Sequence, residues 1–175
     1  MNYKVIFLDR DGVINEDLGY VHKSKDFIFI EGVFSSLKRL QSLGYKFIVV
    51  TNQSGIGRNF FSVQDYRDLD NWMILRFKEN GINILDTFFC PHTPLDKCKC
   101  RKPKPGLFNQ AIEKYNIDID SSWMIGDSER DIVAANRIGI RNSILVRSGH
   151  EINEKNSSAK FVIDSINNVN EIINF

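Results

Sequence analysis

The sequence contains no long hydrophobic run, no excess of charge of either sign and no cysteine outside one short loop. A membrane-spanning helix needs about 20 consecutive apolar residues, and no run approaches that length. The apolar run near the start is broken after four residues by residues 9–11 (DRD), so we do not expect it to be a secretory signal peptide. With 23 basic and 22 acidic residues, the chain has no electrostatic preference for nucleic acid or an anionic membrane. We therefore expect a cytoplasmic protein that binds neither.

The few cysteines argue against a fold held by disulfides. All three lie between Cys90 and Cys100, and an odd number crowded into one loop is a poor disulfide framework but a good metal framework. At 175 residues, of which 42% are hydrophobic, the chain is long enough to bury a core. We expect one domain over residues 1–175.

The stretch over residues 5–12 (VIFLDRDG) predicts a buried strand that ends at a polar site. Four consecutive apolar residues are typical of a parallel sheet, in which both faces of a strand are covered. Asp9 and Asp11 follow directly, and open α/β sheets bind ligands beyond the carboxyl ends of their strands. Two carboxylates close together require a cation, and hard oxygen ligands suit Mg²⁺. The alternative is an acidic turn after a core strand.

Apolar runs and helical stripes alternate along the remaining chain. This alternation predicts an α/β fold with a doubly wound, mostly parallel sheet. Residues 13–27 are expected to form a loop or small hairpin over the site, and residues 149–159 to be loose. Strands are expected at residues 5–8, 46–50, 87–89, 123–125, 143–146 and 161–163, and helices at 32–44, 62–81, 105–115, 132–139 and 166–173.

Polar residues follow three of these strands, at ends that share one edge of the sheet. Thr51 and Asn52 follow the second strand, and their hydroxyl and amide groups suit a phosphoryl oxygen. Asp127 follows the strand at residues 123–125. With Asp9 and Asp11, it would give Mg²⁺ a partial octahedron.

The loop over residues 90–100 (CPHTPLDKCKC) has the composition of a zinc site. Cys90, His92, Cys98 and Cys100 are a Cys₃His set, which selects tetrahedral Zn²⁺. Four protein ligands leave no open position, so the zinc is expected to be structural. The alternative is three free thiols beside a surface histidine.

A stiff basic segment follows the loop. Arg101, Lys102 and Lys104 provide three cations in four residues, flanked by prolines. Close to the carboxylates, these cations would bind a substrate phosphate and balance the negative charge. The alternative is a solvated basic loop.

At this point the sequence resembles the haloacid dehalogenase (HAD) phosphatases. The resemblance is carried, in the family's order, by residues 9–12 (DRDG), 51–52 (TN), 102–103 (KP) and 126–131 (GDSERD). More narrowly, residues 7–15, 19–22 (GYVH), 51–56 (TNQSGI), 90–92, 98–103 and 146–149 (VRSG) are similar to the heptose bisphosphate phosphatases. A sister family, the histidinol-phosphate phosphatases, shares the zinc loop. The short loop is closer to that sister family, and Val13 stands where threonine is common.

The resemblance implies a Mg²⁺-dependent phosphomonoester hydrolase. Asp9 would be the nucleophile that forms an aspartyl-phosphate, and Asp11 would protonate the leaving sugar oxygen and then activate water. Thr51 and Lys102 would hold the transferring phosphoryl oxygens, and Arg101 would recognise the substrate.

The same resemblance supplies the remaining site residues. The Mg²⁺ ligands would be Asp9, Asp11 through its backbone carbonyl, and Asp127, with Asp131 as a supporting partner. The expected substrate-binding residues are Arg10, Asp17, Leu18, Gly19, Tyr20, Asn52, Gln53, Ser54 and Arg101.

The implied fold is a HAD-like, Rossmann-type three-layer sandwich without a large cap domain, in which the zinc loop is a small fixed wall. The implied activity removes the 7-phosphate of D-glycero-D-manno-heptose 1,7-bisphosphate, on the route to nucleotide-activated heptose for lipopolysaccharide or surface glycans. We expect a monomer whose partner is this small sugar bisphosphate. Two alternatives stay open, a histidinol-phosphate phosphatase of histidine biosynthesis and a non-catalytic zinc module that binds a phosphorylated ligand.

Overall fold

Six apolar runs pair into one sheet in the order β3-β2-β1-β4-β5-β6. The computed structural model describes residues 2–174, and every pairing between neighbouring strands in it is parallel. The predicted parallel, doubly wound sheet is confirmed. The strands are β1 (Val5–Leu8), β2 (Lys46–Asn52), β3 (Ile84–Cys90), β4 (Trp123–Gly126), β5 (Asn142–Val146) and β6 (Phe161–Ile163).

The direction in which strands are added reverses at β1. The chain proceeds from β1 to β2 and β3 on one side, then crosses back and continues through β4, β5 and β6 on the other. Strands β1 and β4 pair directly, with Leu8 opposite Ile125. Doubly wound sheets bind their ligands at such a reversal, beyond the carboxyl ends of the strands. The topology therefore places a site where β1 and β4 end.

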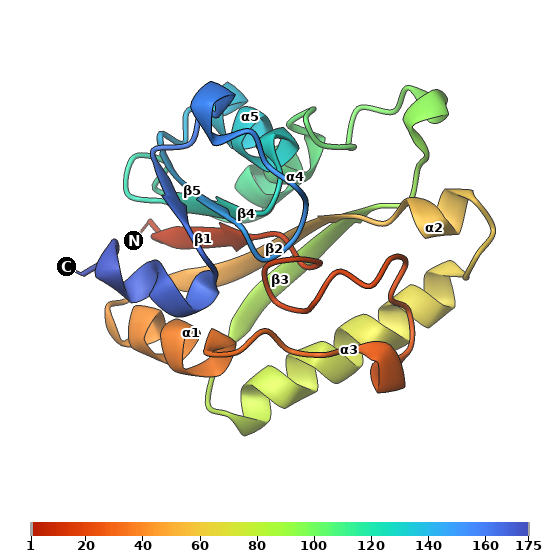
Figure 1. Ribbon diagram of the computed structural model, residues 1–175, viewed down its shortest axis with the longest axis horizontal. Coiled ribbons are helices and arrows are strands. Elements are labelled where there is room, and N and C mark those ends of the chain that lie inside the picture. Colours follow the sequence, from red (N-terminus) through yellow and green to blue (C-terminus); the bar gives the residue numbers. More distant parts are fainter. Residues whose placement is uncertain (1, 175) are drawn as a thin grey trace.

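Helices cover both faces of the sheet (Figure 1). Helices α1 and α3 and the last 3₁₀ helix, η4, lie on one face, and α4 and α5 lie on the other. The helices are α1 (Val33–Ser42), α2 (Ser54–Gly57), α3 (Val63–Glu79), α4 (Gly106–Lys114) and α5 (Glu129–Arg137), with 3₁₀ helices η1 (Ser24–Asp26), η2 (Pro94–Asp96), η3 (Glu154–Asn156) and η4 (Ile166–Glu171).

Strand β1 contributes to both hydrophobic cores. Successive strand side chains point to opposite faces. Ile6 and Leu8 therefore pack in the core beneath α1 and α3, and Val5 and Phe7 in the core beneath α4 and α5. All four side chains are fully buried. This two-sided burial explains the uninterrupted apolar run and holds the residue that follows, Asp9, at a fixed point.

The structure corrects several expected element boundaries. Strand β2 continues through Thr51 and Asn52, and β3 begins at Ile84 and continues to Cys90. The single turn α2 was not expected, and the closing segment is the 3₁₀ helix η4 rather than an α-helix. Asparagines at positions 167, 168 and 170 explain this, because asparagine favours local turns over a regular α-helix.

Loops rather than a further folded unit flank the carboxyl edge of the sheet. Between β1 and α1 the described chain forms loops and the short η1, and between β3 and α4 it forms the cysteine loop with η2. The predicted lack of a large cap therefore agrees with residues 2–174. Within the same residues, no helix combines the length and apolar character needed to cross a membrane.

Candidate active site

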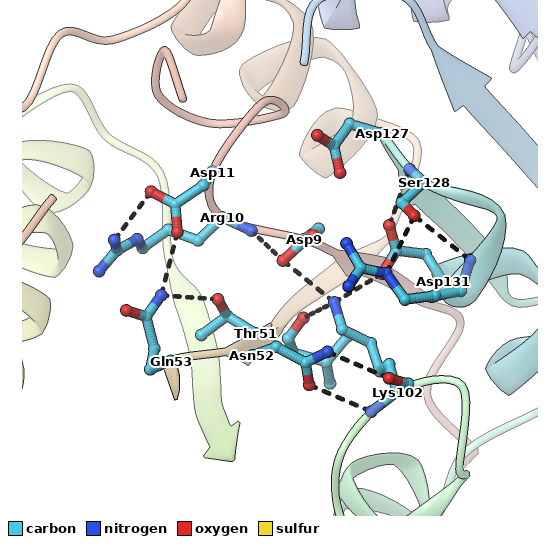
Figure 2. Close-up of polar contacts among 12 residues, drawn as sticks. Asp9, Arg10, Asp11, Thr51, Asn52, Gln53, Lys102, Asp127, Ser128 and Asp131 are labelled. Carbon is cyan, nitrogen blue, oxygen red and sulfur yellow. Dashed lines mark hydrogen bonds and ion pairs between the residues drawn. The ribbon is translucent and has the colours of Figure 1, made fainter. Parts of the chain in front are cut away.

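A cleft of about 330 Å³ opens beyond the carboxyl ends of β1, β2 and β4. It brings together residues from segments far apart in the sequence, as Figure 2 shows for its polar centre. Residues expected from the sequence that line it are Asp9, Asp11, Asp17, Gly19, Tyr20, Thr51, Asn52, Gln53, Ser54, Arg101 and Lys102. It is also lined by Asp131, the expected supporting partner of the metal ligands, and by Arg58, Ser128, Arg130 and His150.

Lys102 is a buried cation surrounded by acceptors. Its ammonium lies 3.0 Å from Oδ1 of Asp9 and 2.7 Å from Oδ1 of Asp131, and it donates to the carbonyl of Val50 at 2.7 Å. Burial by itself lowers the pKa of a lysine, but the charges of Asp131 and Asp9 raise the pKa of Lys102 above its ordinary value. Lys102 is therefore charged at neutral pH, and each of its three N–H bonds has an acceptor.

Asn52 fixes the backbone that carries Lys102. Its amide nitrogen donates to the carbonyl of Lys102 at 3.2 Å, and its amide oxygen accepts from the backbone N–H of Lys102 at 3.1 Å. Asn52 is the last residue of β2, so this reciprocal pair joins the segment after the cysteine loop to the central sheet. The pair sets how far Lys102 reaches toward Asp9.

Three carboxylates crowd beside this single ammonium. Oxygens of Asp9, Asp127 and Asp131 lie within 4.8 Å of one another. Burial raises the pKa of Asp9 to about 6, against the opposing charge of Lys102. Burial also raises the pKa of Asp131, and burial and the charge of Asp9 raise that of Asp127. Since one lysine does not neutralise three acids, the cluster has the charge and the hard oxygen donors that suit a divalent cation.

Asp127 is wedged between two loops and leaves one oxygen unpaired. Its side chain is 0% exposed, and Oδ1 has no hydrogen-bond partner within residues 2–174. Oδ2 accepts from the backbone N–H and from Nδ1 of His150, at 3.0 and 2.6 Å. A Cβ at Gly12, where φ is +82°, or at Gly149 would collide with the carboxylate. A buried carboxylate oxygen without a hydrogen-bond partner in the protein is available to a cation or a water molecule.

The carboxylate of Asp11 does not join this cluster, which corrects the expectation that two carboxylates from the first strand and Asp127 converge. It turns to the opposite side of β1 (Figure 2). Oδ1 accepts from Nη2 of Arg10 at 2.8 Å and from Asn15 at 3.0 Å, and Oδ2 accepts from Gln53 at 3.0 Å. The turn at residues 9–12 thus separates the two acids, leaving only the backbone carbonyl of Asp11 for a cation.

Gln53 connects the ends of β1 and β2. Its amide nitrogen donates both to Asp11 and to Oγ1 of Thr51, the latter at 2.9 Å. Because Oγ1 of Thr51 accepts this bond, the hydroxyl hydrogen of Thr51 is available to a ligand. The hydroxyl and the carboxylate are thereby held in fixed relation at the floor of the cleft.

The cysteine loop gathers four soft ligands at one point. Cys90 Sγ lies 3.6 Å from Cys98 Sγ and 3.2 Å from Cys100 Sγ, and His92 Nδ1 lies 3.2 Å from Cys100 Sγ. A zinc tetrahedron with bonds of about 2.0–2.3 Å has edges of roughly 3.5–3.8 Å. The separations are close to these values, so the four ligands fit one Zn²⁺. The sequence interpretation of the loop as a ligand cluster agrees with this geometry.

Two expected substrate-binding residues lie outside the cleft lining. Arg10 is 1% exposed, and its guanidinium donates to Asp11 and to the carbonyl of Val21. Its effect on a ligand therefore passes through Asp11. Leu18 is 56% exposed and does not line the cleft, although Asp17 and Gly19 on either side of it do.

The sequence reasoning missed Arg58, Ser128, Arg130 and His150 as cleft residues. Ser128 and Arg130 lie inside the quoted motif at residues 126–131, so that motif was the available signal. His150 was included in a segment expected to be loose, which is wrong because it binds Asp127. No local pattern distinguishes Arg58.

Comparisons with known proteins identify relatives of this chain. A family profile described as HAD-hydrolase-like matches residues 99–169. The chain is 46% identical to D-glycero-beta-D-manno-heptose-1,7-bisphosphate 7-phosphatase of Haemophilus ducreyi, over 95% of this chain and 96% of the relative. It is also 46% identical to a D-glycero-alpha-D-manno-heptose-1,7-bisphosphate 7-phosphatase of Photorhabdus laumondii, over 89% of each chain.

A solved structure extends the likeness to three dimensions. The D,D-heptose 1,7-bisphosphate phosphatase of B. bronchiseptica, crystallised with magnesium and phosphate, superposes with a TM-score of 0.84. It is 31% identical in sequence, and the match covers 96% of each chain.

Replacing Lys102 with methionine tests the buried charge cluster. The loss leaves Asp9 and Asp131 without their cation, and breaking a buried ion pair in this way costs about 3–5 kcal/mol. Raised carboxyl pKa values mean that the folded state binds more protons than the unfolded chain. Without Lys102, whose charge lowers the pKa values of Asp9 and Asp131, both values rise further. The variant's stability should therefore fall from about pH 4, the ordinary aspartate pKa, and continue to fall above about pH 6, the wild-type pKa of Asp9, so that its loss relative to the wild type grows with pH.

Urea unfolding of the metal-free protein at several pH values measures this loss. Lys114→Met is the matched control, because Lys114 pairs with Asp86 at the surface, and it should change stability little. The prediction would be contradicted if the two substitutions lowered the free energy of unfolding equally, or if the decrease caused by Lys102→Met did not depend on pH.

Proposed function

Because the chain belongs to the D-glycero-D-manno-heptose-1,7-bisphosphate 7-phosphatases, which are HAD-like hydrolases, we propose that it removes the 7-phosphate of this heptose bisphosphate through an aspartyl-phosphate on Asp9. The observation that carries the catalytic assignment is the contrast between two carboxylates at the end of β1. Asp9 is buried against Lys102, whereas Asp11 is held by neutral and cationic donors on the other side. Acids in such different surroundings are suited to different roles.

Asp9 is suited to act as the nucleophile. Its Oδ1 accepts from the backbone N–H of Arg10 at 2.7 Å and faces Lys102 at 3.0 Å. Across the described part of the chain, no group donates a hydrogen bond to Oδ2. In the first step Oδ2 forms a bond to phosphorus while the bond from phosphorus to the sugar oxygen O7 breaks. The fixed Oδ1 leaves Oδ2 free to attack.

Asp11 supplies and then removes the proton. Protonated on Oδ2, it gives this proton to O7 as the sugar leaves, so that the product is a neutral hydroxyl. The resulting carboxylate is stabilised by Arg10, Asn15 and Gln53. In the second step it takes a proton from the water that attacks the aspartyl-phosphate, which restores Asp9 and protonated Asp11.

Thr51 and Lys102 stabilise the transferring group by different means. The hydroxyl of Thr51 donates to a phosphoryl oxygen, because Gln53 donates to its oxygen and no described residue accepts its hydrogen. The three N–H bonds of Lys102 are already used, so Lys102 acts mainly through its charge beside Asp9. In a buried site such a charge is worth more than in water.

Magnesium is the cation that we propose for the carboxylate cluster. Asp9, the unpaired Oδ1 of Asp127 and the backbone carbonyl of Asp11 would hold it, with Asp131 kept away from this role by Lys102. When bound, Mg²⁺ neutralises the charge that develops on the phosphoryl oxygens.

Three arginines are suited to the second phosphate of the substrate. Burial and the charges of the nearby Arg130 and Arg58 lower the pKa of Arg101. All three side chains line the catalytic cleft, and their mutual repulsion is relieved by an anion. Histidinol phosphate carries an ammonium and an imidazole instead of a second phosphate. The arginines and the relatives compared above therefore favour the heptose bisphosphate over this alternative.

The cysteine loop is proposed to bind one structural Zn²⁺ through Cys90, His92, Cys98 and Cys100. The last ligand stands two residues before Lys102, and the backbone N–H of Arg101 donates to the sulfur of Cys98 at 3.4 Å. A bound zinc would thereby stabilise the backbone that carries the cationic side chains of Arg101 and Lys102. With four protein ligands it would have no open coordination position for chemistry.

Replacing Asp9 with asparagine should abolish phosphate release, by roughly 10⁴-fold or more, because an amide does not form the phosphoenzyme. The fold should persist, since Asp9 lies after β1 at the sheet edge. Phosphate release and circular dichroism measure the two effects, and Asp68→Asn on the exposed side of α3 is the control. Beryllofluoride should be trapped on Asp9 of the wild type. Near wild-type turnover of Asp9→Asn would exclude the covalent mechanism.

Replacing Cys98 with serine, or strong chelation, should remove zinc and make residues 90–102 susceptible to proteases. Activity should fall as well, because the loop would no longer hold Lys102 beside Asp9. Elemental analysis should find about one zinc per wild-type chain. Leu95→Ala is the control in the same loop, because Leu95 is 88% exposed and should leave the zinc content unchanged. A metal-free loop that keeps full activity and protease resistance would disprove the structural role.

The substrate assignment predicts that kcat/KM for the heptose 1,7-bisphosphate exceeds that for histidinol phosphate. One charge-assisted contact of about 1.5–3 kcal/mol corresponds to roughly a 10- to 150-fold difference. Arg130→Met should reduce the advantage of the bisphosphate over heptose 7-phosphate, which lacks the second anion. A higher kcat/KM for histidinol phosphate than for the heptose bisphosphate would contradict the substrate assignment and identify the chain as a histidinol-phosphate phosphatase with the same mechanism.

A further inference from the structure

The hydrogen bonds of Asp127 are distributed unequally between its two oxygens. Oδ2 receives both the backbone N–H and Nδ1 of His150, and Oδ1 receives no bond from any described residue. A carboxylate rotates readily about its last side-chain torsion, because that torsion has a broad energy profile. Two donors on the same oxygen therefore fix which oxygen is left for a cation.

The loop that presents His150 is itself anchored. Arg147 pairs with Glu154 at 2.6 Å and with Asp164 at 2.7 Å, and the hydroxyl of Ser148 donates to the carbonyl of Gly12 at 2.7 Å. Gly149 then packs its backbone directly against Asp127. His150 is therefore held at Asp127 by its chain neighbours, even though its side chain is 47% exposed.

The ring of His150 joins two parts of the cleft. An ionised Asp127 only accepts hydrogen bonds, so Nδ1 carries the hydrogen that faces it. Nε2 lies 3.5 Å from Nη2 of Arg130, a distance at which the neutral ring accepts a hydrogen bond from the guanidinium. Arg130 also donates to the hydroxyl of Ser128 at 3.2 Å. The chain Arg130–His150–Asp127 thus runs from the arginine cluster to the carboxylate cluster.

We infer that His150 is a positioning residue, which holds Asp127 so that its free oxygen faces the cation and which connects that ligand to Arg130. The inference rests on the proposed magnesium site. Groups that hydrogen-bond a metal ligand orient it, and their removal typically weakens metal affinity by about 10- to 100-fold. In His150→Ala the backbone N–H bond to Asp127 remains, so the loss should be near the lower value.

Calorimetric titration of the substrate-free protein with Mg²⁺ tests this role, together with the Mg²⁺ dependence of aryl phosphate hydrolysis. His150→Ala should raise the Kd for Mg²⁺ by about 10-fold. His150→Asn should recover most of the affinity, because its amide nitrogen is as many bonds from Cα as Nδ1. His150→Gln, whose amide nitrogen corresponds to Nε2, should not. His22→Ala is the control histidine and should leave Mg²⁺ affinity unchanged.

At saturating Mg²⁺ the KM for aryl phosphate should be similar in all variants, and each variant should stay folded at the assay temperature without metal. A general structural defect would instead lower the unfolding temperature and affect Asn and Gln variants alike. Unchanged Mg²⁺ affinity in His150→Ala, with a wild type that binds Mg²⁺ and hydrolyses phosphate, would overturn the positioning role alone. A wild type without Mg²⁺ binding or Mg²⁺-dependent hydrolysis would overturn the proposed function as well.

Discussion

The buried ammonium of Lys102 is the interaction on which the polar centre depends. Asp9, Asp127 and Asp131 lie close together in a place from which water is largely excluded, and three such acids repel one another. Lys102 offsets much of this repulsion through contacts of 3.0 and 2.7 Å with two of them. The remaining negative charge suits a divalent cation, so this single ammonium reduces the repulsion and still leaves the cluster able to bind metal.

The location of Lys102 in turn depends on two separate structures. Asn52 binds its backbone from the end of β2, and the cysteine loop delivers the segment from the end of β3. The loop is also bonded to the turn after β2, where Gly57 donates to the carbonyl of Pro91 at 2.8 Å. A loop whose only regular element is the short η2 is thereby given a defined shape. Within residues 2–174 no large cap covers the cleft. The loop itself, which was expected to form a fixed wall, does not line the cleft; Arg101 and Lys102, which follow its last cysteine, do.

The two acids after β1 illustrate how neighbouring residues of one type acquire different functions. Asp9 continues the direction of a strand buried on both faces and meets Lys102. Asp11 lies beyond the turn and meets Arg10 and Gln53 instead. In the proposed mechanism, the separation lets Asp9 bond to phosphorus while Asp11 transfers protons. We infer a similar effect of surroundings at Asp127. His150 holds one oxygen of this carboxylate and leaves the other for the cation.

The local sequence pattern was sufficient to predict the parallel sheet and the positions of Asp9, Thr51 and Asp127 at the ends of strands. It was also sufficient to identify the four candidate ligands in the cysteine loop. Each of these depends on runs of apolar residues or on spacing within a few residues. Only the tertiary structure decided three further features. They are the turn of the Asp11 carboxylate away from Asp9, the pairing of Lys102 with Asp131, and the contact of His150 with Asp127. These contacts join residues up to tens of positions apart, and they form because packing of the sheet and helices brings separate loops to one edge.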